Sequence, residues 1–325
     1  MQTDPRLEDI ELSPAPAWAK ITAGVTRRLP RGRSRFIKWL CRDSHRRFAG
    51  KMARQLGGCT FDCSLQDMVA RNVFFAGCSA AQEIAFVRGV LKPGMNFVDV
   101  GANWGLFTLV AGQLVGSAGR VIALEPDPRI LPKLKANIRR NGLNQAQVMA
   151  VAAAERDSNL LLAAHDHAGE NWGVSRLIEN IPAGQTTFTV QSRRLDSLLN
   201  EAEAEAQAEA GLGAVDLVKI DVEGAEDRVL AGMEPGLSSH RYRRILMELH
   251  PLQLRARGRT ATDVVNALIA KGYHGYSLDY SEAGIRRAYY HPWLHYSEFV
   301  RPLEQGMADA QPRTIWLAEG EPALI

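Results

Sequence analysis

Residues 97–107 read Phe-Val-Asp-Val-Gly-Ala-Asn-Trp-Gly-Leu-Phe, and this stretch decides the fold. The short apolar run at residues 95–100 is typical of a strand that is buried on both faces. After Gly105, apolar residues recur at helical spacing and stop at Gly116, the kind of residue that commonly ends a helix. Gly101 and Gly105 therefore fall in a tight turn between a strand and a helix. Glycine lets the backbone pass close to a ligand there, and free N–H groups of the helix N-terminus face the same place.

A second strand is predicted at residues 120–125, and it ends in Glu125. In doubly wound folds, a carboxylate at the end of the second strand, about 20 residues after the turn, binds ribose hydroxyls. The turn Gly-Ala-Asn-Trp-Gly lacks the three-glycine spacing of dinucleotide-binding proteins, and it follows an acid, Asp99. This combination favours a nucleoside ligand without a pyrophosphate, such as S-adenosylmethionine.

Strand-like and helix-like segments alternate along the rest of the chain. Repeated strand-then-helix units predict a doubly wound, mostly parallel α/β sheet with helices on both faces. We expect strands at residues 147–154, 215–221, 244–248, 273–278 and 314–318, and helices at residues 80–91, 128–140, 225–233 and 260–271, the last opened by a capping box of Thr260 and Asp263. Smaller predicted elements are a strand pair within residues 59–71, added strands at residues 159–164 and 186–192, a short helix capped by Asp196, and a solvated Ala-Glu helix or linker at residues 201–210.

Composition places the chain among ordinary globular proteins. Its 325 residues carry a formal net charge of +3, and no apolar run approaches the ~18 residues of a membrane span. We expect no signal peptide, because the first residues lack a basic-then-apolar pattern. The four cysteines fit no disulfide framework, and no histidine cluster lies beside them for zinc. We expect reduced thiols in a cytoplasmic protein. These cysteines are Cys41, Cys59, Cys63 and Cys78.

The N-terminal part of the chain is strongly basic. Residues 20–54 contain roughly a dozen Lys and Arg and one acid, Asp43, and residues 34–42 mix aromatic, apolar and cationic side chains at helical spacing. Two interpretations remain open: a basic amphipathic helix that lies on an anionic membrane or a partner, and a solvated helix that packs its apolar stripe on the main domain. No recognition motif accompanies the charge, so nucleic acid is not an expected partner. We expect residues 1–57 to form a basic, helical N-terminal extension.

A second informative stretch, Lys-Ile-Asp-Val-Glu-Gly-Ala-Glu at residues 219–226, places three acids and a lysine at the end of a buried strand. Ligands bind at that edge of an open α/β sheet. Buried acids cost stability unless they are paired or hydrogen-bonded, so the cluster indicates a function. Glu226 is explained by the dipole of the next helix, whose N-terminus favours a negative charge. Asp221, at the strand end, is the functional candidate.

The fifth strand ends in Glu248 and His250, and it shares its edge with Asp221 and the glycine turn. A histidine at a sheet edge is usually structural, but this shared edge makes a functional role for His250 equally plausible. His165 and His167 lie in a polar loop and are weaker candidates. The aromatic and histidine-bearing segment 289–299 has two open interpretations, as part of the core or as an acceptor pocket with aromatic faces for sugar rings or apolar groups.

Five motifs occur in order along the chain: Phe-Val-Asp-Val-Gly-Ala-Asn-Trp-Gly, Ala-Leu-Glu-Pro-Asp-Pro, Leu-Asp-Ser-Leu, Leu-Val-Lys-Ile-Asp-Val-Glu-Gly-Ala-Glu and Ile-Leu-Met-Glu-Leu-His-Pro. Together they resemble the FkbM family of S-adenosylmethionine-dependent methyltransferases over residues 63–272. The resemblance implies that residues 58–325 form a seven-stranded Rossmann-like methyltransferase sheet with an antiparallel last strand. It also implies O-methylation of a hydroxyl on a sugar, a glycan or a polyketide-like acceptor.

The resemblance also assigns roles to residues at matching positions. Glu125, with Pro126 beside it, would hold the ribose hydroxyls, and Asp221 would lie beside the transferring methyl group. The methionine end of the cofactor would be lined by Asp99, Gly101, Ala102, Asn103 and Gly105. The basic N-terminal region and the Ala-Glu run match no motif of the family.

The methyl acceptor must lose its hydroxyl proton as the new bond forms. Asp221 or His250 would take that proton, and Glu248 is a third candidate at the same edge. Alternatively, Asp221 and Glu223 bind a divalent cation that lowers the pKa of the hydroxyl. We favour the metal-free scheme because these acids lack the His–acid spacing of a dedicated transition-metal site.

Two other classes of function share part of this pattern. An NAD-dependent oxidoreductase would have the same strand, turn and Glu125, but the missing third glycine and the Asp221 cluster disfavour it. A non-catalytic nucleoside-binding module would keep the fold without the chemistry, and the intact turn and Glu125 argue against it.

Overall fold

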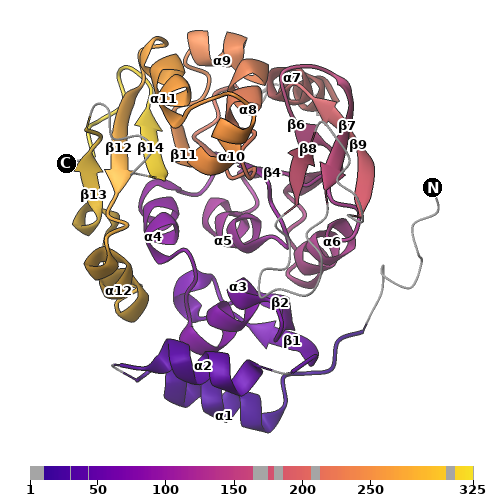
Figure 1. The fold of residues 1–325 in the computed structure, drawn as a ribbon. Helices are drawn as coiled ribbons and strands as arrows, with labels where there is room; N and C mark the ends of the chain where they lie inside the picture. The colour runs from indigo at the N-terminus through magenta and orange to yellow at the C-terminus, as the bar shows by residue number, and fades with distance from the viewer. Residues whose placement is uncertain are drawn as a thin grey trace.

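The computed structural model describes residues 11–29, 31–42, 44–163, 175–178, 186–205, 213–304 and 312–324. Within these residues, a central sheet of eight strands crosses the molecule and helices cover both of its faces (Figure 1). The strands lie in the spatial order β13 (Val300–Pro302), β12 (His274–Leu278), β14 (Arg313–Leu317), β11 (Arg244–Glu248), β10 (Leu217–Ile220), β3 (Asn96–Val100), β4 (Arg120–Leu124) and β5 (Ala146–Met149).

Strand directions confirm the predicted doubly wound, mostly parallel sheet. β5, β4, β3, β10 and β11 are parallel neighbours, and β14 lies antiparallel between β11 and β12. β14 is therefore the expected antiparallel last strand. The short strand β13 adds an eighth strand that the sequence did not predict. It pairs antiparallel with β12 and covers an edge that would otherwise present unpaired backbone groups.

Two hydrophobic cores lie on the two faces of the sheet. Successive side chains of a strand point to opposite faces, so Phe97 of β3 packs into one core and Val98 into the other. Burial on both faces explains why these strands read as continuous apolar runs. The Phe97 core includes residues of α4 (Ala81–Val90), α5 (Leu106–Val115) and α6 (Leu131–Arg140). The Val98 core includes residues of α7 (Leu195–Glu205), α8 (Glu226–Gly232), α9 (Glu234–Ser238), α10 (Pro251–Ala256) and α11 (Ala261–Ile269).

A second sheet of four strands stands beside the central one (Figure 1), in the order β6 (Ala152–Ala153), β9 (Thr187–Arg193), β7 (Ser158–Ala163) and β8 (Arg176–Ile178). β7 and β9 confirm the two predicted added strands as far as the described residues reach. The single strand predicted at 147–154 is wrong. β5 ends at Met149, which pairs with the last residue of β4, and the chain beyond it pairs with β9 instead.

The N-terminal residues form helices that pack on the main body. α1 (Ala17–Thr26) and α2 (Arg33–Cys41) both contact the π-helical turn η3 (Asn72–Ala76) and lie together at the lower end of the molecule in Figure 1. One side of α2 is buried, as the packed-stripe interpretation expects, through Arg33, Ile37 and Cys41. The boundary at residue 57 stays a prediction.

The predicted strand pair within residues 59–71 is wrong. Only β2 (Thr60–Ser64) forms there, and its antiparallel partner is β1 (Arg47–Lys51) upstream. The following residues turn into the short helix α3 (Met68–Arg71) because the Asp67 carboxylate caps it by accepting a hydrogen bond from the Ala70 N–H at 3.0 Å.

The remaining elements complete the chain. The capping box of Thr260 and Asp263 at α11 is confirmed. Asp196 lies inside the first turn of α7, where its carboxylate accepts hydrogen bonds from the Tyr242 hydroxyl at 2.6 Å and the Gly236 N–H at 3.1 Å. The prediction that it caps a short helix is therefore wrong. Residues 206–210 of the Ala-Glu run lie outside the described residues. The last elements are η2 (Arg54–Leu56), α12 (Glu282–Tyr290) and η4 (Tyr296–Glu298).

The four cysteines are free and buried, which confirms the expectation of unpaired thiols. Burial raises the pKa of both Cys41 and Cys59 to about 11. Among the described residues, no single helix has the length and apolar composition needed to cross a membrane. The segments Met68–Ala76 and Ala81–Val90, bent by 70° relative to each other, pass that test only as a pair and only by length and composition.

Candidate active site

A cavity of about 390 Å³ opens at the carboxyl ends of β3, β4, β10 and β11. The strand order reverses between β3 and β10, and ligands of open α/β sheets bind outside the strand ends at such a point. Residues from the turn after β3 and from the ends of the other three strands line this cavity. The sheet therefore brings together segments that are more than a hundred residues apart in sequence.

Both glycines of the turn after β3 are required by the packing of the protein itself. Gly101 has φ +78°, and a Cβ on it would lie 2.0 Å from the carbonyl oxygen of Asp221. Gly105 has φ +97°, and its Cβ would lie 2.7 Å from Leu134 Cδ1. The sequence attributed these glycines to close approach of a ligand. The structure shows that Gly101 lets the ends of β3 and β10 meet, and that Gly105 lets α5 approach α6.

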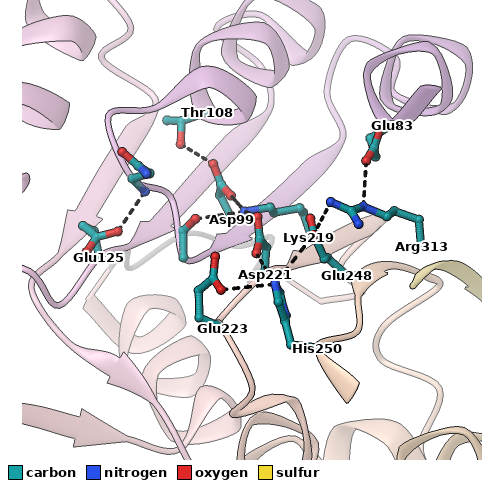
Figure 2. Close-up of polar contacts among 12 residues, drawn as sticks. Glu83, Asp99, Thr108, Glu125, Lys219, Asp221, Glu223, Glu248, His250 and Arg313 are labelled. Carbon is teal, nitrogen blue, oxygen red and sulfur yellow. Dashed lines mark hydrogen bonds and ion pairs between the residues drawn. The ribbon is translucent and has the colours of Figure 1, made fainter. Parts of the chain in front are cut away.

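Glu125 fixes the shape of the turn on the side of β4. One of its carboxylate oxygens accepts a hydrogen bond from the Asn103 N–H and the other from the Asp127 N–H, both at 2.8 Å. Figure 2 shows Glu125 with one of these bonds. Burial raises the pKa of Glu125 to about 7, although these two donors oppose the rise. A carboxylate has about four acceptor sites, so two remain for hydroxyl groups in the cavity that Glu125 lines.

Beneath the turn, Lys219 holds two acids and a carbonyl group together. Its Nζ donates to the Gly101 carbonyl at 2.9 Å and lies 3.6 Å from Asp99 Oδ1 and 3.4 Å from Asp221 Oδ2. Asp99 also accepts a hydrogen bond from the Thr108 hydroxyl at 2.6 Å. Because Asp99 has no exposed surface and does not line the cavity, the structure places it as a support for the turn.

Four carboxylates lie close to His250, and Figure 2 labels three of them, Asp221, Glu223 and Glu248. Its Nδ1 lies 2.8 Å from Glu226 Oε1, in hydrogen-bonding distance. Its Nε2 lies 3.4 Å from Glu223, 3.6 Å from Glu248 and 3.9 Å from Asp221. Glu226 is fully buried, so its bond to Nδ1 fixes the ring with Nε2 turned toward the other three acids, which line the cavity.

The local charges and burial give the members of this cluster different pKa values. Burial lowers the pKa of His250, but Glu226, Glu223 and Asp221 outweigh it and raise the value to about 9. Burial and the charge of Asp221 raise the pKa of Glu248 to about 8. Burial would also raise the pKa of Asp221, but Lys219 and His250 hold it below its usual value. Asp221 is therefore ionised at neutral pH, whereas Glu248 and His250 favour their protonated forms.

Glu83, Tyr280 and Arg313 form a second polar cluster that lines the cavity. Figure 2 shows Glu83 and Arg313 on the opposite side of the site from Glu125. Arg313 in β14 pairs with Glu248, and its Nε lies 3.5 Å from Glu83 Oε1. The guanidinium group stacks 4.5 Å from the ring centroid of Tyr280, and the Tyr280 hydroxyl donates to Glu83. The other oxygen of Glu83 is buried without a hydrogen-bond partner among the described residues. Leaving such an oxygen unpaired costs free energy, and Glu83 itself lines the cavity.

The predicted site residues divide into two sets. Those that line the cavity are Gly101, Ala102, Asn103, Glu125, Pro126, Asp221, Glu223 and Glu248. Asp99 and Gly105 lie beneath the turn, and His250 lies behind the acids it contacts. Residues 289–299, all of them described, do not line the cavity, and Phe299 is buried in the core as one of the two interpretations expected. His165 and His167 lie outside the described residues.

Several residues of the site escaped sequence reasoning. Glu226 was assigned only to the helix dipole, although it also orients His250. The sequence places Lys219 within a motif but does not predict its contacts with Gly101, Asp99 and Asp221. No sequence signal identifies Glu83, Tyr280 or Arg313, because each comes from a different element and no motif surrounds it.

The comparisons with known proteins agree with this geometry. The sequence pattern described as "Methyltransferase FkbM domain" matches residues 99–278, which is more than half of the chain. The chain belongs to the FkbM methyltransferase family. The matched region of this FkbM protein begins at β3 and ends with β12, so it contains the glycine turn, Glu125 and the His250 cluster.

Curated relatives match about half of this chain. The 31-O-demethyl-FK506 methyltransferase FkbM of Streptomyces tacrolimicus is 33% identical over 177 residues, which cover 49% of this chain and 67% of that protein. The 2-O-methyltransferase NoeI of Sinorhizobium fredii is 27% identical over 46% of this chain and 62% of its own length. The AMB antimetabolite synthetase AmbE of Pseudomonas aeruginosa is 28% identical over 58% of this chain, but the match covers only 10% of AmbE.

Solved structures include a methyltransferase FkbM from Methylobacillus flagellatus. It is 15% identical to this FkbM protein, with a TM-score of 0.39, over 77% of this chain and 54% of that chain.

Proposed function

We propose that this protein is an S-adenosylmethionine-dependent O-methyltransferase that acts on a hydroxyl of a small-molecule or glycan acceptor, such as a sugar or a polyketide-like compound. The observation that carries the proposal is one cavity that joins the Glu125 side of the sheet edge to the acids around His250. Glu125, Gly101 and Asn103 form its cofactor side. Glu83, Glu248, Tyr280 and Arg313 form its acceptor side.

The residues of the cofactor side suit S-adenosylmethionine. Glu125 keeps two acceptor sites for the ribose hydroxyls, and a ligand with a pyrophosphate would bring negative charge toward a cavity lined by Glu125, Asp221 and Glu223. When bound, S-adenosylmethionine supplies a methyl group on a positively charged sulfur. Asp221, held ionised by Lys219, is placed to attract that positive charge.

Removal of the acceptor's proton is the chemical task left to the protein. We assign it to the pair Glu248 and His250, because Glu248 lines the cavity and its carboxylate lies 3.6 Å from His250 Nε2. The pair can accept a proton only after it has released one of its own, so its active form accumulates as the pH rises through about 8. Two groups at this distance release their protons in steps that belong to the pair rather than to either residue. Asp221 acts electrostatically, since a carboxylate with a lowered pKa is a weak base. On the acceptor side, Glu83, which lines the cavity, is the residue to accept a hydrogen bond from a second hydroxyl.

A divalent cation is the second candidate for acidifying the hydroxyl. Asp221, Glu223 and His250 each offer one ligand atom, and these atoms all lie within 4.8 Å of one another. Glu226 would then orient His250 as a ligand from behind, as carboxylates commonly do for metal-bound histidines. In this scheme, activity is lost on chelation and restored by a divalent ion.

Calorimetry with S-adenosylmethionine and with NAD tests the proposal against its rivals. We expect binding of S-adenosylmethionine and none of NAD, because the site offers no cradle of three glycines for a pyrophosphate. Incubation with methyl-labelled S-adenosylmethionine and a panel of sugars and hydroxylated polyketides should then transfer label to an alkali-stable ether. Binding of NAD alone would identify an oxidoreductase. Tight binding of the nucleoside without label transfer to any acceptor or water would favour the non-catalytic module.

A further inference from the structure

The outer surfaces of α1 and α2 carry large apolar side chains although the opposite sides of both helices are buried. Ile21 and Val25 of α1 are 69% and 54% exposed, and Trp39 of α2 is 70% exposed. Phe36 is 38% exposed, and its ring centroid lies 5.8 Å from that of Trp39. The core contacts of these helices are already supplied by their buried sides, so packing within the chain does not account for this outward apolar surface.

Cations surround these apolar side chains. Between residues 20 and 54 the sequence has a single acid, Asp43, so the outward surface of both helices is positive. The exposed cations on α1 and α2 and on the residues next to these helices are Lys20, Arg28, Arg31, Arg35, Lys38 and Arg42. Long basic side chains can extend their charged ends away from an apolar contact while their stems stay in it.

We propose that this surface, made by the outward sides of α1 and α2 and called here the α1–α2 face, docks the protein on an anionic lipid membrane. Aromatic and aliphatic side chains on such a face enter the boundary between headgroups and acyl chains. The surrounding Lys and Arg are attracted to anionic headgroups, and each contributes near the surface. Neither helix crosses the bilayer in this arrangement, since α1 has 10 residues and α2 has 9.

Charge complementarity favours a membrane over the other occupants of this face. In a two-fold dimer the same patch meets itself, so the cations of one copy would face those of the other. Nucleic acid would satisfy the cations, but Ile21 and Val25 gain nothing from a phosphate backbone. An anionic bilayer satisfies both kinds of side chain at once.

Vesicle sedimentation of the full chain at low salt tests this proposal. We expect the protein to pellet with vesicles of phosphatidylcholine and phosphatidylserine and to stay in solution with phosphatidylcholine alone. Trp39→Ser and Ile21→Ser should each weaken partition by about tenfold, the effect of losing one buried large apolar side chain. Lys20→Gln and Arg35→Gln should each weaken it by about fivefold, and added salt should weaken it further.

Ile269→Ser is the matched control for Ile21→Ser. Ile269 is 48% exposed on α11, which lies at the end of the molecule opposite α1 and α2 in Figure 1. The control should bind vesicles like the parent protein, and all of these variants should keep the parent affinity for S-adenosylmethionine. The proposal is overturned if the parent ignores phosphatidylserine vesicles, or if Trp39→Ser and Ile269→Ser bind them equally. A dimer that Trp39→Ser dissociates, with no vesicle binding by the parent, would instead identify a self-association surface.

Discussion

The cofactor side and the acceptor side of the cavity are built in different ways. On the cofactor side, Gly101, Asn103 and Glu125 come from one strand-turn-helix-strand unit of about 30 residues, a typical size for such units. On the acceptor side, Glu83 of α4, Glu248 of β11, Arg313 of β14 and Tyr280 of the loop after β12 are spread over most of the chain. The first side is a local motif, whereas the second exists only after the sheet has brought its strands together.

This difference has a consequence for how each side responds to change. The turn on the cofactor side is fixed by backbone requirements, such as the close approach of Gly101 to Asp221. The acceptor side is fixed by side chains that hold one another, with Arg313 between Glu83 and Glu248. A substitution there changes the surface offered to an acceptor and leaves the fold of the cofactor unit in place.

The largest expected effect comes from the pair at the junction of the two sides. His250→Gln should lower turnover by about 10²–10⁴-fold, the usual contribution of a positioned base, and leave the affinity for S-adenosylmethionine intact. Steady-state kinetics and calorimetry measure the two quantities. His274→Gln, an exposed histidine in β12, is the control and should behave like the parent. If activity is lost on chelation and regained with a divalent ion, a bound metal rather than the pair Glu248 and His250 promotes loss of the acceptor's proton.

The second prediction concerns the pH dependence of stability that Glu125 imposes. Its pKa rises from an ordinary 4.5 to about 7 on folding, which corresponds to about 3 kcal/mol. Because the folded state holds this proton more tightly, the contribution is fully present below pH 4.5 and is lost as the pH rises through 7. Urea unfolding across this range should show a fall in the free energy of unfolding that is about 3 kcal/mol smaller in Glu125→Gln, where only the other buried acids such as Glu248 contribute. Glu304→Gln, at an exposed position, should keep the fall. Equal slopes in all three proteins would mean that burial does not shift Glu125.

The smallest effects separate the two sides by affinity. Glu125→Ala should weaken binding of S-adenosylmethionine by about 1–3 kcal/mol, the cost of unmade charged hydrogen bonds, without changing the KM for the acceptor. Glu83→Gln should raise the KM for the acceptor by about tenfold or less and leave the affinity for S-adenosylmethionine unchanged. Calorimetry gives the first quantity and initial rates give the second. If both variants changed both quantities, the cofactor side and the acceptor side would not be independent of each other.

Sequence reasoning reached the cofactor side because its signals are local. A strand ending in Asp99, a glycine turn and a second strand ending in Glu125 can be read within one stretch of sequence. The ends of β10 and β11 were also predicted, since parallel strands place their carboxyl ends at one edge. The contact of His250 with Glu226 was missed because it depends on how α8 begins after the strand, and Glu226 already had a simpler explanation there.

The acceptor side could not be predicted, and the reason is physical. Arg313 reaches Glu248 only because β14 lies antiparallel beside β11, and Glu83 meets them only because α4 covers that part of the sheet. Pairing partners of this kind are set by tertiary packing, which leaves no periodic or compositional trace. The split between β5 and β6 was missed for a similar reason. The apolar run continues through residue 154, and only the end of β4 shows where the central sheet stops.

The buried cysteines allow local opening of the N-terminal quarter of the chain to be measured by their rate of alkylation. All four thiols are buried, Cys41 at the end of α2 and Cys63 within β2, and raised pKa values keep Cys41 and Cys59 protonated and slow to react. An alkylating reagent therefore modifies only those molecules in which this quarter has opened. The rate of modification then measures the free energy of that local opening, separately from unfolding of the central sheet. If lipid vesicles slow the alkylation of Cys41, whose helix carries Trp39, the decrease in rate measures how much membrane binding stabilises that helix against local opening.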